Sequence, residues 1–195
     1  RRRTHFISFI SMTSMLGIAL GVTALITVLS VMNGFEKELR DRILGMASHA
    51  TVTTFSGKLP DWEGLYGSLA DQDRIVAMAP YIRGESMLSI GTQVSGALLR
   101  GVLPAMEGDV SDVVSHINGG NLSLLEPGKY GIILGSELAI ALGAGIGDYV
   151  TVVSPQVTIG PTGILPRLRR FTVMGIFEVG MYEYDRGVAL VHLKD

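Results

Sequence analysis

The sequence contains no cysteine. This absence excludes a disulfide-stabilised scaffold and a metal site built from thiolates, and it leaves the cellular compartment open. The four histidines are scattered along the chain, and no carboxylate stands at ligand spacing from them. The formal net charge of −2 also lacks the basic excess that is typical of nucleic-acid-binding proteins.

Sequence motifs of catalysis and nucleotide binding are missing as well. There is no HExxH zinc motif, no GxSxG nucleophile elbow and no Walker A lysine. Gly143, Gly145 and Gly147 are spaced like a dinucleotide-binding loop, but they follow an expected helix and precede an expected strand, which reverses the required order. Asp71 and Asp73 are expected in a solvated turn. We therefore predict no catalytic site, no metal site and no cofactor in this chain.

Charged side chains are absent from Phe6 to Phe35. The apolar run over residues 6–32 would form a helix of about 40 Å, which exceeds the hydrocarbon core of about 30 Å. A cleaved signal peptide and a buried helix of a soluble protein are the alternatives. The apolar region of a signal peptide spans only about 7–15 residues, and no small-residue cleavage site follows here. We predict a membrane anchor. The arginines that precede it, Arg1–Arg3, favour an N-terminus in the cytoplasm.

The expected anchor carries two features that a simple anchor does not need. Gly17 and Gly21 form a GxxxG pair, which predicts close packing against another helix. The alternative is that the hydroxyl groups of this segment bond only to carbonyl groups of their own helix. Large apolar residues crowd the outer membrane boundary and are expected to contact lipid or lipoprotein, with ordinary lipid contact as the alternative: Ile26, Leu29, Met32 and Phe35.

The helical pattern continues beyond the apolar run. Oppositely charged residues stand four apart at Glu36 and Arg40, and again in the next two pairs along the chain, as expected on a solvated helix. We predict a rigid amphipathic stalk. The expected organisation is a cytoplasmic flank and transmembrane helix over residues 1–33, the stalk over 34–48, and an outer domain over 49–195.

The outer domain reads as α+β, because strands and helices are mixed without regular βαβ alternation. A helix is expected to start at Pro60 and Asp61, with Trp62, Leu65 and Leu69 on one face. A short helix is expected within 106–125. Strands are expected at residues 50–55, within 75–90, at 97–102 and at 131–134. A helix at 136–142 and a strand at 149–153 follow, and a final antiparallel pair at 170–177 and 187–192 ends the chain.

The segment over residues 154–168 is expected to be a loop between strands, and it is unusual. It is about 15 residues long, whereas hairpin loops usually take 2–5. Three prolines stiffen it, since each fixes φ, and it is apolar. We predict a stiffened arm that docks a partner, with a loop folded back on its own domain as the alternative. The residues expected to bind are Pro155, Ile159, Pro161, Ile164, Leu165, Pro166, Arg167 and Arg169, and Arg170 flanks them.

Three segments together resemble a known family. The run over Ala19–Gly45, which includes NGFEKEL, is similar to the first transmembrane helix and stalk of LolC and LolE, the lipoprotein-releasing system transmembrane proteins. The LRGVLP segment over Leu99–Pro104 and the GSELA unit over Gly131–Pro155 resemble their MacB-like periplasmic core, although the GSELA unit is common to many MacB-type transporters.

The resemblance implies a periplasmic domain with a Porter-like core and a Sabre-like insert at about residues 106–126. It implies an inner-membrane ABC transporter that passes outer-membrane lipoproteins to a LolA-like periplasmic chaperone. A LolD-like cytoplasmic ATPase would bind ATP and Mg²⁺, and the second transmembrane subunit would be LolE-like or identical. The loop at 154–168 corresponds in position to the hook of LolC, which binds the chaperone, so the resemblance favours LolC or a LolC-like single subunit over LolE.

Two other functions remain open at this point. A MacB-type exporter or an FtsX-like mechanotransmission subunit would use the same architecture on a different substrate. A signal-anchored binding or sensory domain would need no ATPase. The family has four transmembrane helices and this chain shows one, so the ATPase contacts are not in this sequence.

Overall fold

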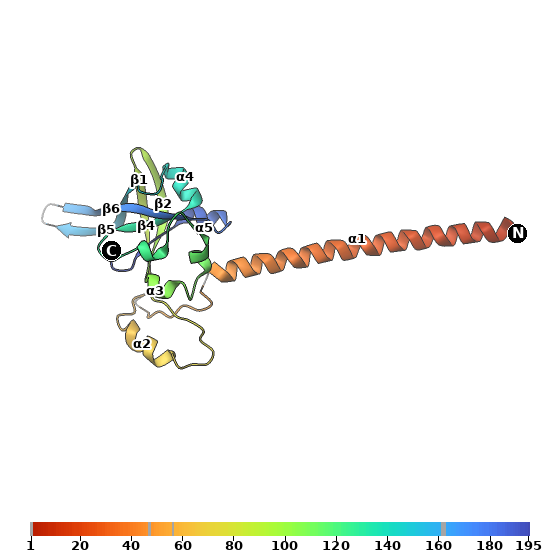
Figure 1. Cartoon of the computed structure of the whole chain (residues 1–195), viewed down its shortest axis with the longest axis horizontal. Coiled ribbons are helices and arrows are strands. Elements are labelled where there is room, and N and C mark those ends of the chain that lie inside the picture. Colours follow the sequence, from red (N-terminus) through yellow and green to blue (C-terminus); the bar gives the residue numbers. More distant parts are fainter. Residues whose placement is uncertain (1, 47, 56, 161–162) are drawn as a thin grey trace. The chain divides into compact units, whose positions relative to one another are not determined.

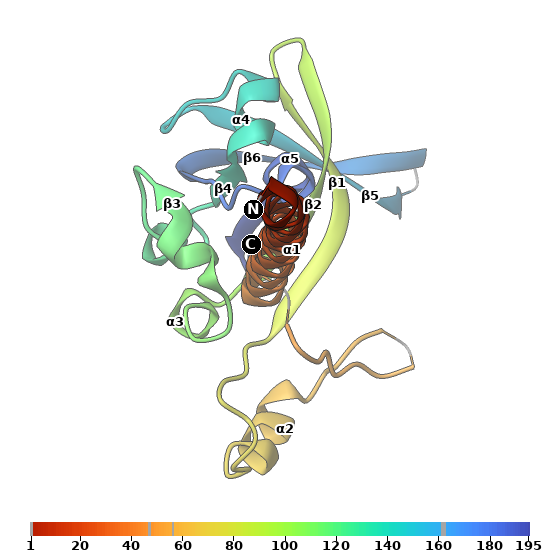
Figure 2. The same ribbon diagram turned by 90° about the vertical axis from the view of Figure 1, so that its right-hand side faces the viewer.

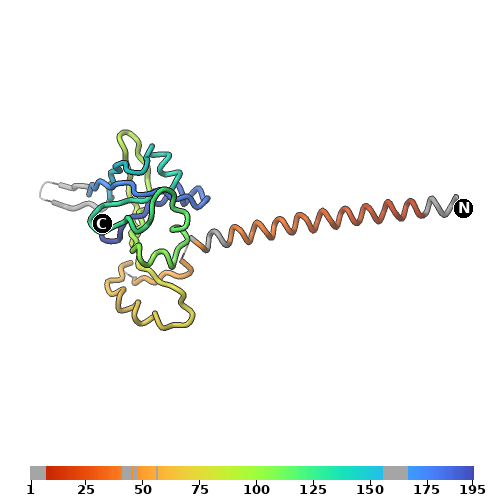
Figure 3. Tube along the Cα trace, in the orientation of Figure 1, coloured from red at the N-terminus to blue at the C-terminus, as the bar shows by residue number. Residues whose placement is uncertain are grey.

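A computed structural model describes residues 2–46, 48–55, 57–160 and 163–195, and it describes side chains except those of residues 2–7, 41–44, 46 and 156–166. The chain forms two compact units, Arg1–Ala47 and Ser48–Asp195. Figure 3 follows both by residue number.

The first unit is one continuous helix, α1 (Arg2–Met46) (Figure 1). Its stretch from Ser8 to Arg40 is the one described helix that is long and apolar enough to cross a membrane. The predicted continuation of the helix through the stalk is therefore confirmed, and the Glu36–Arg40 ion pair is present at 3.0 Å. The other two predicted pairs include side chains outside those described.

Hydroxyl groups in α1 bond within their own helix. Thr13, Thr23 and Thr27 each donate to the carbonyl oxygen four residues earlier, at 2.8–2.9 Å. These bonds satisfy the hydroxyls without a second helix, as the alternative interpretation held. Gly17 and Gly21 have open space where a side chain would project, so packing of this face against another helix stays a prediction.

The second unit is built around a sheet whose strand pairings close into a ring. The hydrogen-bonded order runs β6-β4-β7-β2-β1-β5, β5 pairs with β6 again, and the short β3 is attached to β6. The strands are β1 (Tyr81–Ile90), β2 (Gln93–Val102), β3 (Ile117–Asn118), β4 (Gly131–Gly135), β5 (Tyr149–Gly160), β6 (Gly163–Phe177) and β7 (Val188–His192). Figures 1 and 2 show β1 and β2 side by side as one long hairpin.

The second unit also contains several short helices. They are α2 (Trp62–Leu69), α3 (Pro104–Glu107), α4 (Ser136–Leu142), α5 (Tyr182–Gly187) and the 3₁₀ helices η1 (Asp112–His116) and η2 (Leu122–Leu124). Leu138, Ala139 and Leu142 of α4 join the inward side chains of the strands in one apolar core. Gly143 ends α4 in the left-handed region at φ 63°, where glycine is favoured. The GSELA unit is therefore a buried strand, a helix and a glycine cap.

Several sequence predictions are confirmed. Helix α2 begins after Asp61, whose carboxylate accepts a hydrogen bond from the Gly64 amide. Its half-buried residues are the predicted Trp62, Leu65 and Leu69. The strand, helix and strand of the 131–153 region lie where they were expected. The mixed helix and sheet content agrees with the α+β prediction.

Two predictions of local structure are wrong. Residues 50–55 are exposed and form no strand, because no described strand pairs with them. The final two strands are not a pair, since the fully buried β4 lies between β6 and β7 and bonds to both. The short helix expected within 106–125 is present as the 3₁₀ helix η1, with the end of α3 before it and η2 after it.

Candidate functional site

The region that was predicted as a long loop is a two-stranded arm. Strands β5 and β6 pair without a long loop up to Gly160 and Gly163, so the expected loop at 154–168 is wrong in its secondary structure. Strand β5 pairs with β1 at Thr151–Val153, and β6 pairs with β4 from Thr172 onward. Between these contacts, the described pairings of β5 and β6 are only with each other. We call residues 154–168 the arm (Figure 1).

The prolines of the arm explain why the sequence looked like a loop. A proline lacks an amide donor, so it is tolerated in a strand at an edge or a bulge. The pairing register of β5 and β6 shifts between Ser154 and Val157, which places Pro155 at this irregularity. Pro166 lies opposite Val157. In the described pairings each strand of the arm bonds only to the other strand, so proline does not prevent their pairing.

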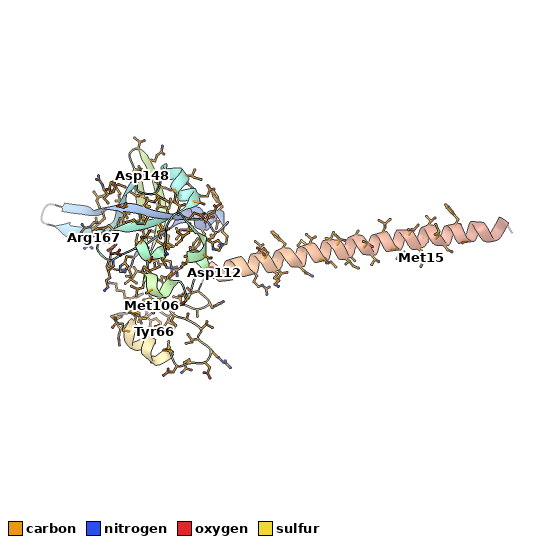
Figure 4. The ribbon with its side chains drawn as sticks, viewed as in Figure 1. Met15, Tyr66, Met106, Asp112, Asp148 and Arg167 are labelled. Carbon is orange, nitrogen blue, oxygen red and sulfur yellow. The ribbon has the colours of Figure 1, made fainter. Side chains whose placement is uncertain are left out.

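The base of the arm is anchored in the core. Val150, Val152 and Phe171 are at most 5 % exposed. The amide of Val173 donates to the carbonyl of Asp148 at 2.9 Å, and the Asp148 carboxylate accepts from the Gly145 amide at 2.7 Å. Figure 4 labels Asp148 near α4 and Arg167 on the arm. The arm therefore continues from strands whose inward side chains are buried in the core.

The predicted binding residues divide into two groups. Pro155, Arg167 and Arg169 are described and exposed. The Arg169 guanidinium lies 5.0 Å from the centre of the Tyr130 ring, and that of Arg170 lies 5.6 Å from the Tyr149 ring. The side chains of the others lie outside the described residues: Ile159, Pro161, Ile164, Leu165 and Pro166. In the backbone register, Ile164 is opposite Ile159 and Leu165 is opposite Thr158.

A cavity of about 860 Å³ lies elsewhere in the second unit, between the segment that carries α2 and the start of β1. Its lining includes Trp62, Leu65 and Leu69 of α2, with Tyr81 and Arg100 on the opposite side. The described residues hold no group of three or more histidine and carboxylate side chains that could bind a metal ion.

Sequence reasoning missed a buried ion pair beside this cavity. Arg100 of β2 and Glu107 of α3 lie 3.0 Å apart, and the Glu107 side chain is 1 % exposed. The Arg100 guanidinium also lies 5.0 Å from the centre of the Tyr81 ring. The LRGVLP segment contains Arg100, but its pairing with Glu107 depends on how α3 folds against β2, which the sequence pattern does not show. Burial raises the pKa of Glu107, and the nearby Arg100 lowers it in part.

The raised pKa of Glu107 predicts a pH dependence of stability. Since the folded state binds this proton more tightly than the unfolded state, the contribution is fully present below the ordinary pKa of 4.5 and is lost as pH rises through the folded value. Glu107→Gln removes the titrating carboxyl group but leaves an amide oxygen as a hydrogen-bond acceptor for Arg100. We expect the free energy of unfolding of the variant to improve relative to the wild type as pH rises above about 4.5, measured by urea denaturation. A difference that stays constant from pH 4 to pH 7 would contradict this.

Comparison with known proteins identifies the family of the chain. Residues 11–194 match the family model of the MacB-like periplasmic core domain.

The chain belongs to that family.

Relatives of the MacB-like family support the predicted resemblance. The chain is 48% identical to the lipoprotein-releasing system transmembrane protein LolC of Xylella fastidiosa (strain 9a5c), over all of this chain and 47% of the relative. It is 43% identical to LolC of Neisseria meningitidis serogroup B over the same shares. LolE of Haemophilus influenzae is 29% identical over 80% of this chain and 38% of the relative. The chain thus spans about half the length of the curated LolC relatives, and the resemblance to the LolC and LolE family is confirmed.

The four residues that were predicted at the membrane boundary lie on α1. The side chains of Ile26, Leu29, Met32 and Phe35 are each more than half exposed within their unit. Their contact with lipid or lipoprotein stays a prediction, as does the division of the MacB-like domain into a Porter-like core and a Sabre-like insert at 106–126.

Proposed function

We propose that this chain is part of a LolC-like transmembrane subunit of an ABC transporter that releases outer-membrane lipoproteins and passes them to a periplasmic chaperone. The observation that carries the proposal is the identity of 43% to 48% with LolC proteins over every residue of the chain. This identity favours lipoprotein release over MacB-type export or FtsX-like mechanotransmission, which would share only the core domain.

The proposal assigns energy supply to other subunits. This chain has no Walker A motif, so ATP and Mg²⁺ would bind in a LolD-like cytoplasmic ATPase, and this chain would not itself be an enzyme. The second transmembrane subunit would be LolE-like or a second copy. Helix α1 would cross the bacterial inner membrane with its arginine-rich end in the cytoplasm. The MacB-like domain would then lie in the periplasm.

Two regions of the chain would contact the lipoprotein substrate and the periplasmic chaperone. Acyl chains of a lipoprotein are apolar, so they would be received at the membrane boundary by Ile26, Leu29, Met32 and Phe35. The arm would dock the LolA-like chaperone, whose cavity must also be apolar to hold the same acyl chains. The paired strands of the arm supply this contact with less ordering cost than a flexible loop of the same length.

The proposed function predicts that lipoprotein can be captured at the outer end of α1. A photoreactive phenylalanine replaces Met32 or Phe35 in the full-length protein, assembled with its ATPase and second subunit. Irradiation should capture triacylated lipoprotein, detected by mass spectrometry. Met15, which is 73 % exposed near the other end of α1, serves as the matched control position (Figure 4). Capture of bulk phospholipid alone at all three positions would contradict the proposal.

A further inference from the structure

The cavity beside α2 has a mainly apolar and aromatic lining. Helix α2 contributes Trp62, Leu65 and Leu69 to it, and these side chains are only half-buried. No residue of α2 is fully buried, and Figures 1 and 2 show this helix beyond the sheet, on the side of α3. The volume of about 860 Å³ falls within the range of about 300–1,000 Å³ that is usual for small-molecule sites. The cavity is therefore large enough to receive an apolar chain.

The charged residues that line this cavity are all cations. They are Lys58, Arg83 and Arg100, and the described lining includes no aspartate or glutamate. Arg83 of β1 lies directly opposite Arg100 of β2. Opposite residues of antiparallel strands share one face of the sheet, and like charges in this position repel each other. The pair of arginines is therefore unfavourable unless anions lie close to it.

Glu107 supplies one such anion, but only for Arg100. Its carboxylate lies 3.0 Å from the Arg100 guanidinium and is buried. Arg83 and Lys58 are exposed, and neither forms an ion pair within the described part of the chain. Two positive charges at the cavity thus lack a counter-ion from the described residues. An apolar cavity with such charges is complementary to an amphiphile that has an anionic head and an acyl chain.

The sequence around the cavity favours membrane lipid as the source of this amphiphile. Residues 48–53 follow α1 directly in the chain, and Ser48, Ala50, Thr51, Val52 and Thr53 belong to the lining. If α1 crosses the inner membrane, phospholipid is present at a high effective concentration for a site joined to that helix by so short a segment. A free fatty acid has the same head-and-chain chemistry but gains nothing from this link.

We propose that this cavity binds an anionic phospholipid of the membrane, with one acyl chain against α2 and the phosphate near Lys58 and Arg83. Arginine binds phosphate oxygens through two parallel hydrogen bonds, and lysine adds a point charge. Trp62 and Tyr66 of α2 both line the cavity, and their rings combine an apolar body with a polar group. The inference rests on the proposed membrane location of α1, but not on lipoprotein release or chaperone docking.

Trp62 reports on the cavity directly, because it is the single tryptophan of these 195 residues. Full-length protein is placed in phosphatidylcholine nanodiscs that contain increasing shares of phosphatidylglycerol with one brominated acyl chain. Bromine quenches tryptophan fluorescence on contact, and subtracting the signal of Trp62→Phe removes the contribution of any other tryptophan. We expect half-maximal quenching at a share at least about tenfold lower than with brominated phosphatidylcholine. Equal quenching by the two lipids would overturn the proposal.

Charge variants test the head-group contact. Lys58→Gln with Arg83→Gln should raise the half-quenching share of brominated phosphatidylglycerol by at least about tenfold. Arg74→Gln with Lys194→Gln is the matched control, because it removes the same charge from exposed residues outside the lining. This control should leave the quenching unchanged, and circular dichroism verifies that both variants are folded. An equal effect of the two double variants would mean that lipid is attracted only by net charge, which contradicts a built site.

A fatty-acid arm separates the two sources of the amphiphile. Brominated fatty acid is added to phosphatidylcholine nanodiscs, and it should quench Trp62 less than brominated phosphatidylglycerol does at the same share. Quenching by the fatty acid but not by phosphatidylglycerol would overturn the assignment to a membrane phospholipid. The test uses neither lipoprotein nor chaperone, so its failure leaves the proposed release function standing. A transporter that fails to pass lipoprotein to the chaperone would, in turn, leave this binding result unaffected.

Discussion

Replacing Ile164 and Leu165 by aspartate is expected to abolish binding of the LolA-like chaperone. Burial of an apolar side chain of this size contributes about 1.5–3 kcal/mol, so loss of two such contacts weakens binding by at least about 100-fold. Burial of the two new carboxylates in an apolar cavity would add a desolvation cost. The dissociation constant is measured by isothermal titration calorimetry with the full-length protein in nanodiscs.

A matched variant controls for the added charge. Ile140→Asp with Ile146→Asp places two carboxylates at residues that are 73 % and 52 % exposed, outside the arm. This control should keep wild-type affinity. Far-UV circular dichroism shows whether the arm variant retains its sheet. A folded arm variant that binds the chaperone with wild-type affinity would refute the docking role of residues 154–168.

Gly135→Ala is expected to cause a large loss of stability in the second unit. Gly135 joins β4 to α4, and an added methyl group would lie 2.1 Å from the carbonyl oxygen of Asp185 in α5. Backbone atoms cannot turn aside as a flexible side chain can, so α5 would have to move. That shift would strain the Asp185 carboxylate, which accepts hydrogen bonds from the amides of Val179 and Gly180 at 2.9 and 3.0 Å.

The expected cost of this substitution is about 3 kcal/mol, which corresponds to a melting temperature lower by about 6–12 °C. Gly96→Ala is the matched control, because the space around Gly96 is open. Its stability should stay within about 0.5 kcal/mol of the wild type. Circular dichroism, with fluorescence from Trp62, the single tryptophan, follows unfolding. Equal melting temperatures for the two variants would mean that the close approach of α5 to Gly135 is wrong.

Local patterns were sufficient for the elements whose stability is local. The charge-free run predicted α1, and Asp61 with the apolar spacing that follows it predicted α2. In the GSELA unit, a fully buried strand precedes a helix that a glycine ends, so the sequence signal and the structure coincide. These elements depend mainly on capping, periodicity and burial, which a single sequence displays.

Other features depend on partners that are distant in the chain. The β-branched residues at 50–55 favour extended backbone, but a strand also needs a neighbour, and no described strand supplies one. The arm was mistaken for a loop because its prolines suggested that pairing ends, whereas the register shift places Pro155 where a bulge tolerates it. The Arg100–Glu107 pair and the closed ring both arise from tertiary contacts. The residues that were predicted to bind the chaperone therefore lie on a different scaffold from the one expected.

The central proposal is that lipoprotein leaves the transporter through a chaperone docked on the arm. Transfer of lipoprotein from reconstituted membranes to the chaperone tests this most directly. Full-length protein is assembled with its ATPase and second subunit in proteoliposomes loaded with triacylated lipoprotein, and LolA-type chaperone and ATP are added. The account predicts that lipoprotein appears in the soluble, chaperone-bound fraction, and that Ile164→Asp with Leu165→Asp leaves it in the membrane. Transfer at the wild-type rate by that variant, or no ATP-dependent transfer by the wild type, would contradict the account.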